Sequence, residues 1–178
     1  MNREKLLSDE IRLTEGVLDP EDRRILFEWG ENIFGLEDLL LRWRPKDWHF
    51  ILDADGRAAS HVGILKHTVS AGGQAVVVCG VGGVVTVPEA QGRGYAQRLM
   101  RHAAAYMCEE LGVEFGFLFC RDQLVAFYER LGWRLVTGPV EVEQEAGPLV
   151  PPFNVMVLPC GEGREWPEGK VKLKSLPW

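Results

Sequence analysis

The segment from Val84 to Ala96 holds the residues best suited to chemistry in this chain of 178 residues. A valine-rich run typical of a strand leads through a glycine turn into an amphipathic segment typical of a helix. A turn that opens a helix presents free backbone N–H groups and the positive end of the helix dipole, which together bind phosphate. Gly92 and Gly94 have no Cβ, so a ligand can approach their backbone closely. The spacing predicts a pyrophosphate-binding turn, with Arg93 as an added charged contact.

Three phosphate-binding motifs compete for this turn. The P-loop sequence GxxxxGK[ST] is missing. The dinucleotide motif GxGxxG fails because Gln97 stands at its third glycine, and because the preceding strand is expected in a meander rather than in a βαβ unit. The third motif, Q/R-x-x-G-x-G/A, is matched at every defined position by Gln91, Gly94 and Ala96. It is the acyl-CoA-binding signature of the GNAT superfamily of N-acetyltransferases, which the chain also resembles in the order of its elements.

This resemblance implies a fold and a coenzyme. The fold would be α/β (α+β), with a central mixed, mostly antiparallel sheet of about seven strands flanked by about four helices. Acetyl-CoA would bind as a co-substrate, and no metal is expected. The coenzyme-binding residues would be Val85, Thr86, Val87, Gln91, Gly92, Arg93, Gly94, Tyr95 and Ala96. A backbone N–H near Val85 would polarise the thioester carbonyl as a one-donor oxyanion site.

A second matching segment lies downstream. The run from Phe127 to Trp133 is similar to the FYxxxGF segment of the same superfamily, with Trp133 in place of the phenylalanine. The resemblance gives Tyr128 the role of general acid, which protonates the coenzyme thiolate as it leaves the tetrahedral intermediate. Without the resemblance, Tyr128 would be interpreted as an ordinary core aromatic residue.

Three glycines interrupt the strand that precedes the turn, namely Gly80, Gly82 and Gly83. Glycine in a strand often marks a bulge or the close approach of a ligand. The resemblance implies that this strand splays from its neighbour and pairs with the pantetheine arm, with Gly82 and Gly83 beside the acceptor. The alternative is that the glycines merely permit tight packing.

Within the superfamily, the chain resembles the aminoglycoside 2′-N-acetyltransferases in its strand spacing, in its acidic loop with prolines, and in a tail that ends in tryptophan. That branch implies that Trp178 and its carboxylate contact the acceptor, whereas chain ends are often frayed. The branch carries a glutamate base where this chain has Gly82. His61 and His67 are candidates for the missing base, although each is better explained as a structural or surface histidine.

The elements that position these residues follow from periodicity and turn signals. We expect strands at 11–13, 49–53, 58–69, 74–87, 115–120, 133–136 and 154–158. We expect helices at 20–31, 36–42, 93–111 and 123–131. Asp19 would cap the first helix, with Pro20 at its first position and Trp29 facing inward. Residues 1–160 would form the N-acetyltransferase domain, and 161–178 a tail that packs near the acceptor site.

Composition narrows the class of protein. The chain is 46% hydrophobic and carries a net charge of −6, without the basic patch of a nucleic-acid-binding surface or the polybasic run of a membrane-binding one. The four cysteines show no CxxC pair and no metal spacing. The first ten residues lack the apolar core of a signal peptide. We therefore expect a cytoplasmic monomer or homodimer with reduced thiols, Cys120 being buried and inert.

The leading functional hypothesis is direct acetyl transfer from acetyl-CoA to a primary amine on a small molecule, without a covalent enzyme intermediate. An aminoglycoside-like acceptor is the first choice, a metabolite amine or polyamine the second, and a protein amine the third. The alternative from a different class is a non-catalytic acyl-CoA-binding module that serves as a sensor or interaction domain. The sequence leaves open whether a longer acyl-CoA is the donor.

Overall fold

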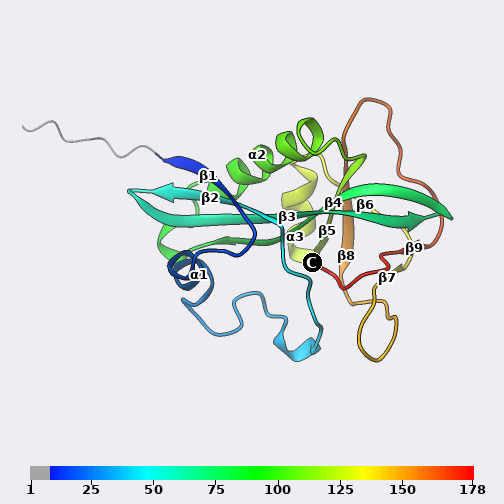
Figure 1. Ribbon diagram of the computed structural model, residues 1–178, viewed down its shortest axis with the longest axis horizontal. Helices are drawn as coiled ribbons and strands as arrows, with labels where there is room; N and C mark the ends of the chain where they lie inside the picture. The colour runs from blue at the N-terminus through cyan, green and yellow to red at the C-terminus, as the bar shows by residue number, and fades with distance from the viewer. Residues whose placement is uncertain (1–8) are drawn as a thin grey trace, which may run out of the picture.

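The computed structural model describes residues 9–178, and one mixed sheet organises them (Figure 1). Its strands are β1 (Glu10–Glu15), β2 (Trp48–Ala54), β3 (Arg57–Ala71), β4 (Gln74–Thr86), β5 (Phe115–Cys120), β6 (Arg134–Leu135), β7 (Val140–Glu141), β8 (Asn154–Pro159) and β9 (Val171–Lys172). The main order is β1-β2-β3-β4-β5-β8-β6, and β9 pairs with β3 and β7. Pairing is antiparallel except for β4 with β5 and β7 with β9. The expected mostly antiparallel α/β fold is confirmed, with nine strands in the sheet.

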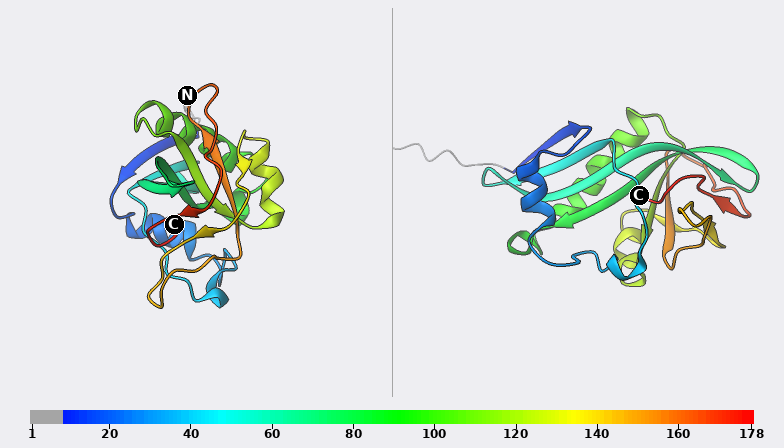
Figure 2. Two further views of the ribbon diagram at one scale, coloured as in Figure 1. Left: turned by 90° about the vertical axis from the view of Figure 1, so that its right-hand side faces the viewer. Right: turned by 60° about the horizontal axis from the view of Figure 1, so that its bottom comes forward.

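Three α-helices cover the sheet in the described part of the chain: α1 (Pro20–Phe27), α2 (Tyr95–Glu109) and α3 (Asp122–Glu129). Figure 2 shows α2 on one face of the sheet, with α1 and α3 toward the other. The apolar side chains of α2 recur at helical spacing and are buried, as at Leu99, Met100 and Ala103. This packing fixes the start of α2, and therefore the glycine turn, against the end of β4.

The segment between α1 and β2 departs from the expected helices. Helix α1 begins as predicted, because the Asp19 side chain accepts a hydrogen bond from the Glu21 N–H at 2.8 Å. It ends at Phe27, four residues early, and Trp29 is 40% exposed and donates its indole N–H to the Leu26 carbonyl. The helix expected at 36–42 is only the short 3₁₀ turn Glu37–Leu39. The remaining residues between α1 and β2 form no regular helix or strand. Tertiary contacts, rather than local helix propensity, determine their conformation.

The C-terminal tail is part of the fold. Val171 and Leu173 are fully buried in a second hydrophobic cluster that also contains Phe117 and Trp178. The lysines that alternate with them, at 170, 172 and 174, are exposed, as the alternation predicts. Because β9 pairs with both β3 and β7, loss of the tail would uncover this cluster.

The cysteines require a correction. The sequence suggested reduced thiols throughout, but Cys108 in α2 and Cys160 after β8 form a disulfide with 5.1 Å between their Cα atoms. The pair lies 52 residues apart in sequence and meets only because α2 and β8 both lie against β5, so no local spacing could reveal it. Cys79 and Cys120 are free and buried. A structural disulfide is more typical of oxidising compartments than of the cytoplasm.

Candidate functional site

The sheet opens into a fork between β4 and β5. The two strands pair in parallel from Val78 opposite Phe115 to Val81 opposite Leu118, and then separate. Strand β4 continues to Thr86 against β3, while β5 continues to Cys120 against β8. One edge of β4 is therefore unpaired beyond Val81. Such an edge offers N–H and C=O groups to a ligand that carries amides of its own.

A β-bulge lies at the mouth of this fork. Gly82 pairs with Gly63 and Val85 with His61, so Gly83 and Val84 together face the single residue Val62. Gly83 has φ +60°, a left-handed conformation that favours glycine. The bulge that the glycines predicted is therefore present, and it turns β4 where the fork begins.

A pair of buried histidines holds the bulge in place. His61 Nδ1 donates to the Gly83 carbonyl at 2.6 Å, and its Nε2 meets His49 Nδ1 at 2.8 Å. His61 is 2% exposed, and burial lowers its pKa to about 3. Its nitrogens are enclosed, so His61 cannot take a proton from a substrate. Its role is to position the Gly83 carbonyl.

His67 is engaged in the same way. Its Nδ1 accepts from the Arg44 guanidinium at 3.1 Å, and its Nε2 donates to the Leu173 carbonyl at 2.8 Å. The histidine joins the segment before β2 to the C-terminal tail. Both histidine candidates for the base are therefore structural, as the alternative interpretation held.

The end of β4 narrows the choice of oxyanion donor near Val85. Val87 donates its N–H to the Ala59 carbonyl of β3 at 2.9 Å. Successive N–H groups of a strand point to alternate edges, so the N–H of Val85 also faces β3. The Val85 carbonyl accepts from the Ser60 hydroxyl on that same side, at 2.9 Å. The N–H of Thr86, between Val85 and Val87, is therefore directed toward the fork, and the oxyanion donor expected near Val85 is best supplied by Thr86.

The glycine turn has the form that the motif predicts. Gly92 and Gly94 both have φ +77°, and nothing described lies within 4 Å of a Cβ built on either one. The backbone N–H groups of residues 92–97 have no hydrogen-bond partner among residues 9–178. They lie at the start of the 15-residue helix α2, where its dipole favours an anion.

The side chains of the turn divide into two groups. Gln91 donates its amide to the Thr86 carbonyl at 3.1 Å and so closes the turn onto β4. Tyr95 is buried, and its hydroxyl donates to Asp9 at 3.3 Å. Arg93 is exposed and free to approach a phosphate. The motif glutamine is thus a scaffold for the turn, which the sequence pattern alone did not distinguish from a ligand contact.

Tyr128 reaches the fork from α3. It is 5% exposed and packs against Phe127 and Trp133, so the core interpretation is correct for most of the ring. It also borders a cavity of about 540 Å³ that Gly82, Gly83 and Val84 line from the other side. Burial raises the pKa of the Tyr128 phenol above its ordinary value, which keeps the group protonated at neutral pH. A protonated phenol beside the fork suits a general acid.

Lys46 is the residue that sequence reasoning missed. Its side chain crosses β3 and β4, so a Cβ on Gly63 would lie 2.5 Å from its Cγ and one on Gly82 would lie 2.8 Å from its Cε. Its ammonium donates to the Arg44 carbonyl at 3.2 Å and borders the cavity. Burial lowers the pKa of Lys46 to about 8. Gly63 and Gly82 face each other on neighbouring strands, and this pair of glycines was the available signal that a side chain crosses the sheet there.

Trp178 lies at the cavity but is mostly core. It is 3% exposed, and its indole N–H donates to the Phe117 carbonyl at 3.1 Å. A Cβ on Gly80 would lie 2.2 Å from the Trp178 ring, so Gly80 is a glycine because the indole packs on β4. The tight-packing interpretation therefore holds for Gly80 and also for Gly82, where a Cβ would lie 2.9 Å from the main-chain carbon of Trp178. Gly82 and Gly83 also line the cavity.

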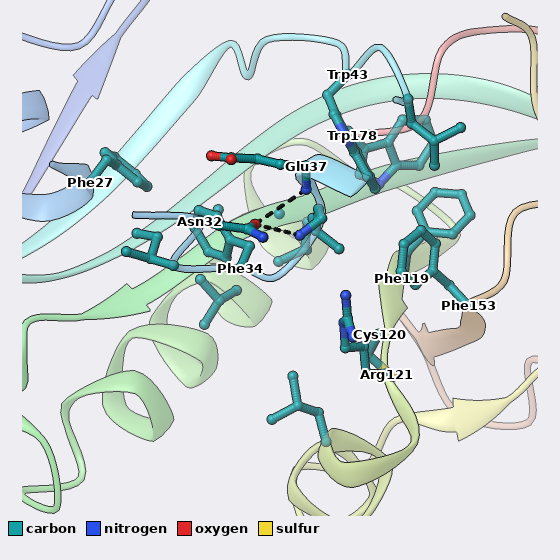
Figure 3. Close-up of a pocket in the computed structure, with 18 of the residues that line it drawn as sticks. Phe27, Asn32, Phe34, Glu37, Trp43, Phe119, Cys120, Arg121, Phe153 and Trp178 are labelled. Atoms are coloured by element: carbon teal, nitrogen blue, oxygen red, sulfur yellow. Dashed lines mark hydrogen bonds between the residues drawn. The ribbon is translucent and has the colours of Figure 1, made fainter. Parts of the chain in front are cut away.

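Figure 3 shows the cavity, with side chains that converge from segments far apart in the sequence. Asn32 orders one wall of the cavity, because its side-chain oxygen accepts hydrogen bonds from the N–H groups of Leu36 and Glu37 at 2.8 and 3.2 Å. Arg121 joins that wall to β5 by donating to the Gly35 carbonyl. No group of three residues suited to hold a metal occurs within residues 9–178. In the same range, no helix is long and apolar enough to span a membrane.

Comparison with known proteins gives one family. A family model described as an acetyltransferase (GNAT) domain matches residues 4–136. Nodulation protein A of Bradyrhizobium elkanii is 31% identical over 140 residues, which cover 70% of this chain and 64% of that protein. The chain thus spans somewhat less than two thirds of that relative.

Solved structures show the same fold. The GNAT family N-acetyltransferase YhbS from Escherichia coli, in complex with CoA, matches with a TM-score of 0.58 at 17% identity, covering 98% of this chain and 94% of that one. A GNAT family acetyltransferase from Brucella melitensis, in complex with acetyl-CoA, matches with a TM-score of 0.53 at 17% identity, covering 91% and 94%. Identities this low bear on the fold alone.

Proposed function

This chain belongs to the GNAT acetyltransferase family, and on that premise we propose that it transfers the acetyl group of acetyl-CoA to a primary amine on a small molecule. The observation that carries the proposal is that the fork, the protonated Tyr128 and the free N–H groups of residues 92–97 lie along one path. The pyrophosphate binds at the turn, and the pantetheine amides pair with the open edge of β4. The thioester then lies at the mouth of the fork.

The transfer is direct. The amine nitrogen attacks the thioester carbon, the oxyanion takes a hydrogen bond from a β4 N–H, and the carbon–sulfur bond breaks as Tyr128 protonates the departing sulfur. The proton that the nitrogen loses as the amide forms restores the Tyr128 phenol. Cys120 lines the same cavity, but burial raises its pKa to about 11, so the thiol stays protonated and is a poor nucleophile. This supports attack by the amine itself, without an acyl-enzyme intermediate.

The amine must lose a proton before it attacks, because an amine with a pKa of about 9 or above is mostly an ammonium ion at neutral pH. Lys46 is the group at the cavity whose pKa is suited to receive that proton. Its lowered pKa of about 8 gives it a neutral fraction at physiological pH. Its Cε would lie 2.8 Å from a Cβ on Gly82, the position at which the resembling branch has a glutamate. Lys46 therefore replaces the two histidines as the proposed base.

An aminoglycoside-like acceptor is the narrower hypothesis that the sequence resemblance suggested. Its support is the place of Trp178 and Gly82 at the cavity. Against it, Glu37 is the only acidic residue among the described residues that line the cavity, and it is exposed. A polycation would therefore find few partners.

The test is a thiol-release assay with acetyl-CoA over a panel of amines and aminoglycosides, corrected for hydrolysis and confirmed by mass spectrometry of the product. We expect an N-acetylated small molecule. If acetyl-CoA binds but no member of the panel is acetylated, the chain is better described as the acyl-CoA-binding module of the alternative hypothesis.

A further inference from the structure

Besides Tyr128, six aromatic side chains line the cavity. They come from the end of α1, the irregular segment before β2, strand β5, the loop before β8 and the tail, at Phe27, Phe34, Trp43, Phe119, Phe153 and Trp178. Figure 3 shows Trp43, Trp178, Phe119 and Phe153 gathered on one side of the cavity. Trp43 and Phe153 belong to loops far apart in sequence, yet their ring centroids lie 5.8 Å apart. Two rings at this spacing pack against each other and together present an aromatic surface to a ligand.

The charges at the cavity favour an acceptor with few charges of its own. Lys46 and Arg121 bring two basic side chains to its lining, whereas the acid Glu37 is exposed. Beyond the exposed Glu37 carboxylate and the main-chain oxygen of Trp178 beside Gly82, the lining offers a polycation few anionic groups to pair with its further ammonium groups, and an unpaired buried charge is costly. A single amine avoids this cost, because it can give up its proton to Lys46.

We infer that the cavity takes an amine carried on one flat aromatic body with no second cationic centre, an inference that rests on the proposed function. The aromatic body lies against the surface that Trp43 and Phe153 form together, and its amine points toward Lys46 and the mouth of the fork. This assigns the acceptor class that the sequence left open and sets the aminoglycoside hypothesis aside.

An alternative occupant of this cavity is the hydrocarbon chain of a longer acyl-CoA. A hydrocarbon chain has no polar group for the Lys46 ammonium or the Glu37 carboxylate to contact, whereas an amine has one. Both side chains border the cavity, so the amine is the occupant that uses the whole lining.

The experiment compares kcat/KM for 2-phenylethylamine, ethylamine and kanamycin with acetyl-CoA as donor. We expect the full chain to prefer 2-phenylethylamine over ethylamine by about 10-fold to 100-fold, which is the value of burying one aromatic ring. Trp43→Ala and Phe153→Ala should each reduce this preference several-fold, because they lower the kcat/KM for 2-phenylethylamine more than the kcat/KM for ethylamine. Leu135→Ala is the matched control, because Leu135 is 45% exposed and lies outside the cavity lining.

Three results would overturn the inference: a preference for kanamycin, no preference between the two simple amines, or lining variants that change only the choice between acetyl-CoA and octanoyl-CoA. Failure of the proposed function would look different. In that case no amine is acetylated, and calorimetry of 2-phenylethylamine with the CoA-loaded protein decides the inference. Binding that Trp43→Ala weakens and Leu135→Ala does not would uphold the aromatic site, and absence of binding would refute it.

Discussion

Replacing Gly94 with valine should abolish most of the affinity for coenzyme A while costing the fold little more than a matched substitution elsewhere. Gly94 has φ +77° at the start of α2, and Gly112 has φ +58° just past the end of the same helix. Neither glycine has a described atom within 4 Å of a built Cβ. The pair Gly94→Val and Gly112→Val therefore imposes the same kind of backbone strain in equally open surroundings, at opposite ends of one dipole.

The magnitudes separate the two effects. A left-handed conformation costs a residue with a Cβ roughly 1–2 kcal/mol, so both variants should lose about that much free energy of unfolding. At Gly94 the new side chain also occupies the side of the turn from which a phosphate approaches the N–H groups of residues 92–97. Loss of two charge-assisted hydrogen bonds, at roughly 1.5–3 kcal/mol each, corresponds to about 10²-fold to 10⁴-fold in affinity.

The assay is isothermal titration calorimetry with CoA, accompanied by urea unfolding of both variants. We expect Gly112→Val to bind CoA like the unmodified chain and Gly94→Val to bind it at least about 10²-fold more weakly at comparable stability. Unchanged affinity in Gly94→Val would refute the assignment of the turn. Equal weakening in both variants would show that strain in α2, and not contact with the phosphate, was responsible.

Four further predictions concern the fork and the tail. Tyr128→Phe should lower kcat by about 10²-fold to 10⁴-fold and leave CoA affinity intact, and normal turnover would reduce Tyr128 to a packing residue. The kcat/KM should rise through the pKa of Lys46, about 8, and Lys46→Met should lose that limb of the pH profile. The lowered pKa of Lys46 means that the unfolded chain binds more protons between about pH 8 and 10.5, so stability rises with pH there. Lys46→Met should accordingly be more stable than the unmodified chain at pH 7 by thermal unfolding, an advantage that disappears above pH 10.5. Gly80→Ala should cost about 1–3 kcal/mol in urea unfolding, because its Cβ meets the Trp178 ring, and Trp178→Leu in the same chain should recover part of that loss.

The features that the sequence predicted are those that depend on local sequence patterns. The strands of the meander and α2 followed from periodicity, and the turn at residues 92–97 followed from a motif whose glycines need positive φ. The bulge at Gly83 was visible for the same reason. Each of these features depends on residues close together in the chain, so the residue types and their spacing are enough to predict it.

The features that the sequence did not predict depend on contacts between distant segments. Lys46 crosses two strands because glycines in β3 and β4 happen to be in register, and Cys108 meets Cys160 only after β5 brings α2 and β8 together. Helix α1 ends at Phe27 with Glu28 as its C-cap, and the irregular residues that follow line the cavity together with distant segments. The orientation of the Val85 N–H likewise follows from the strand pairing, which a one-dimensional pattern does not contain.

The central claim is that acetyl-CoA lies with its pyrophosphate on the turn at residues 92–97 and its thioester at the mouth of the fork. Amide NMR of the isotope-labelled chain during titration with CoA tests this residue by residue. We predict large shifts for the N–H groups of Gly92, Gly94, Val84 and Thr86, and none for Gly73 at the far hairpin of β3 and β4. Shifts confined to residues away from the turn and the fork, or saturable binding that leaves these four amides unmoved, would contradict the account.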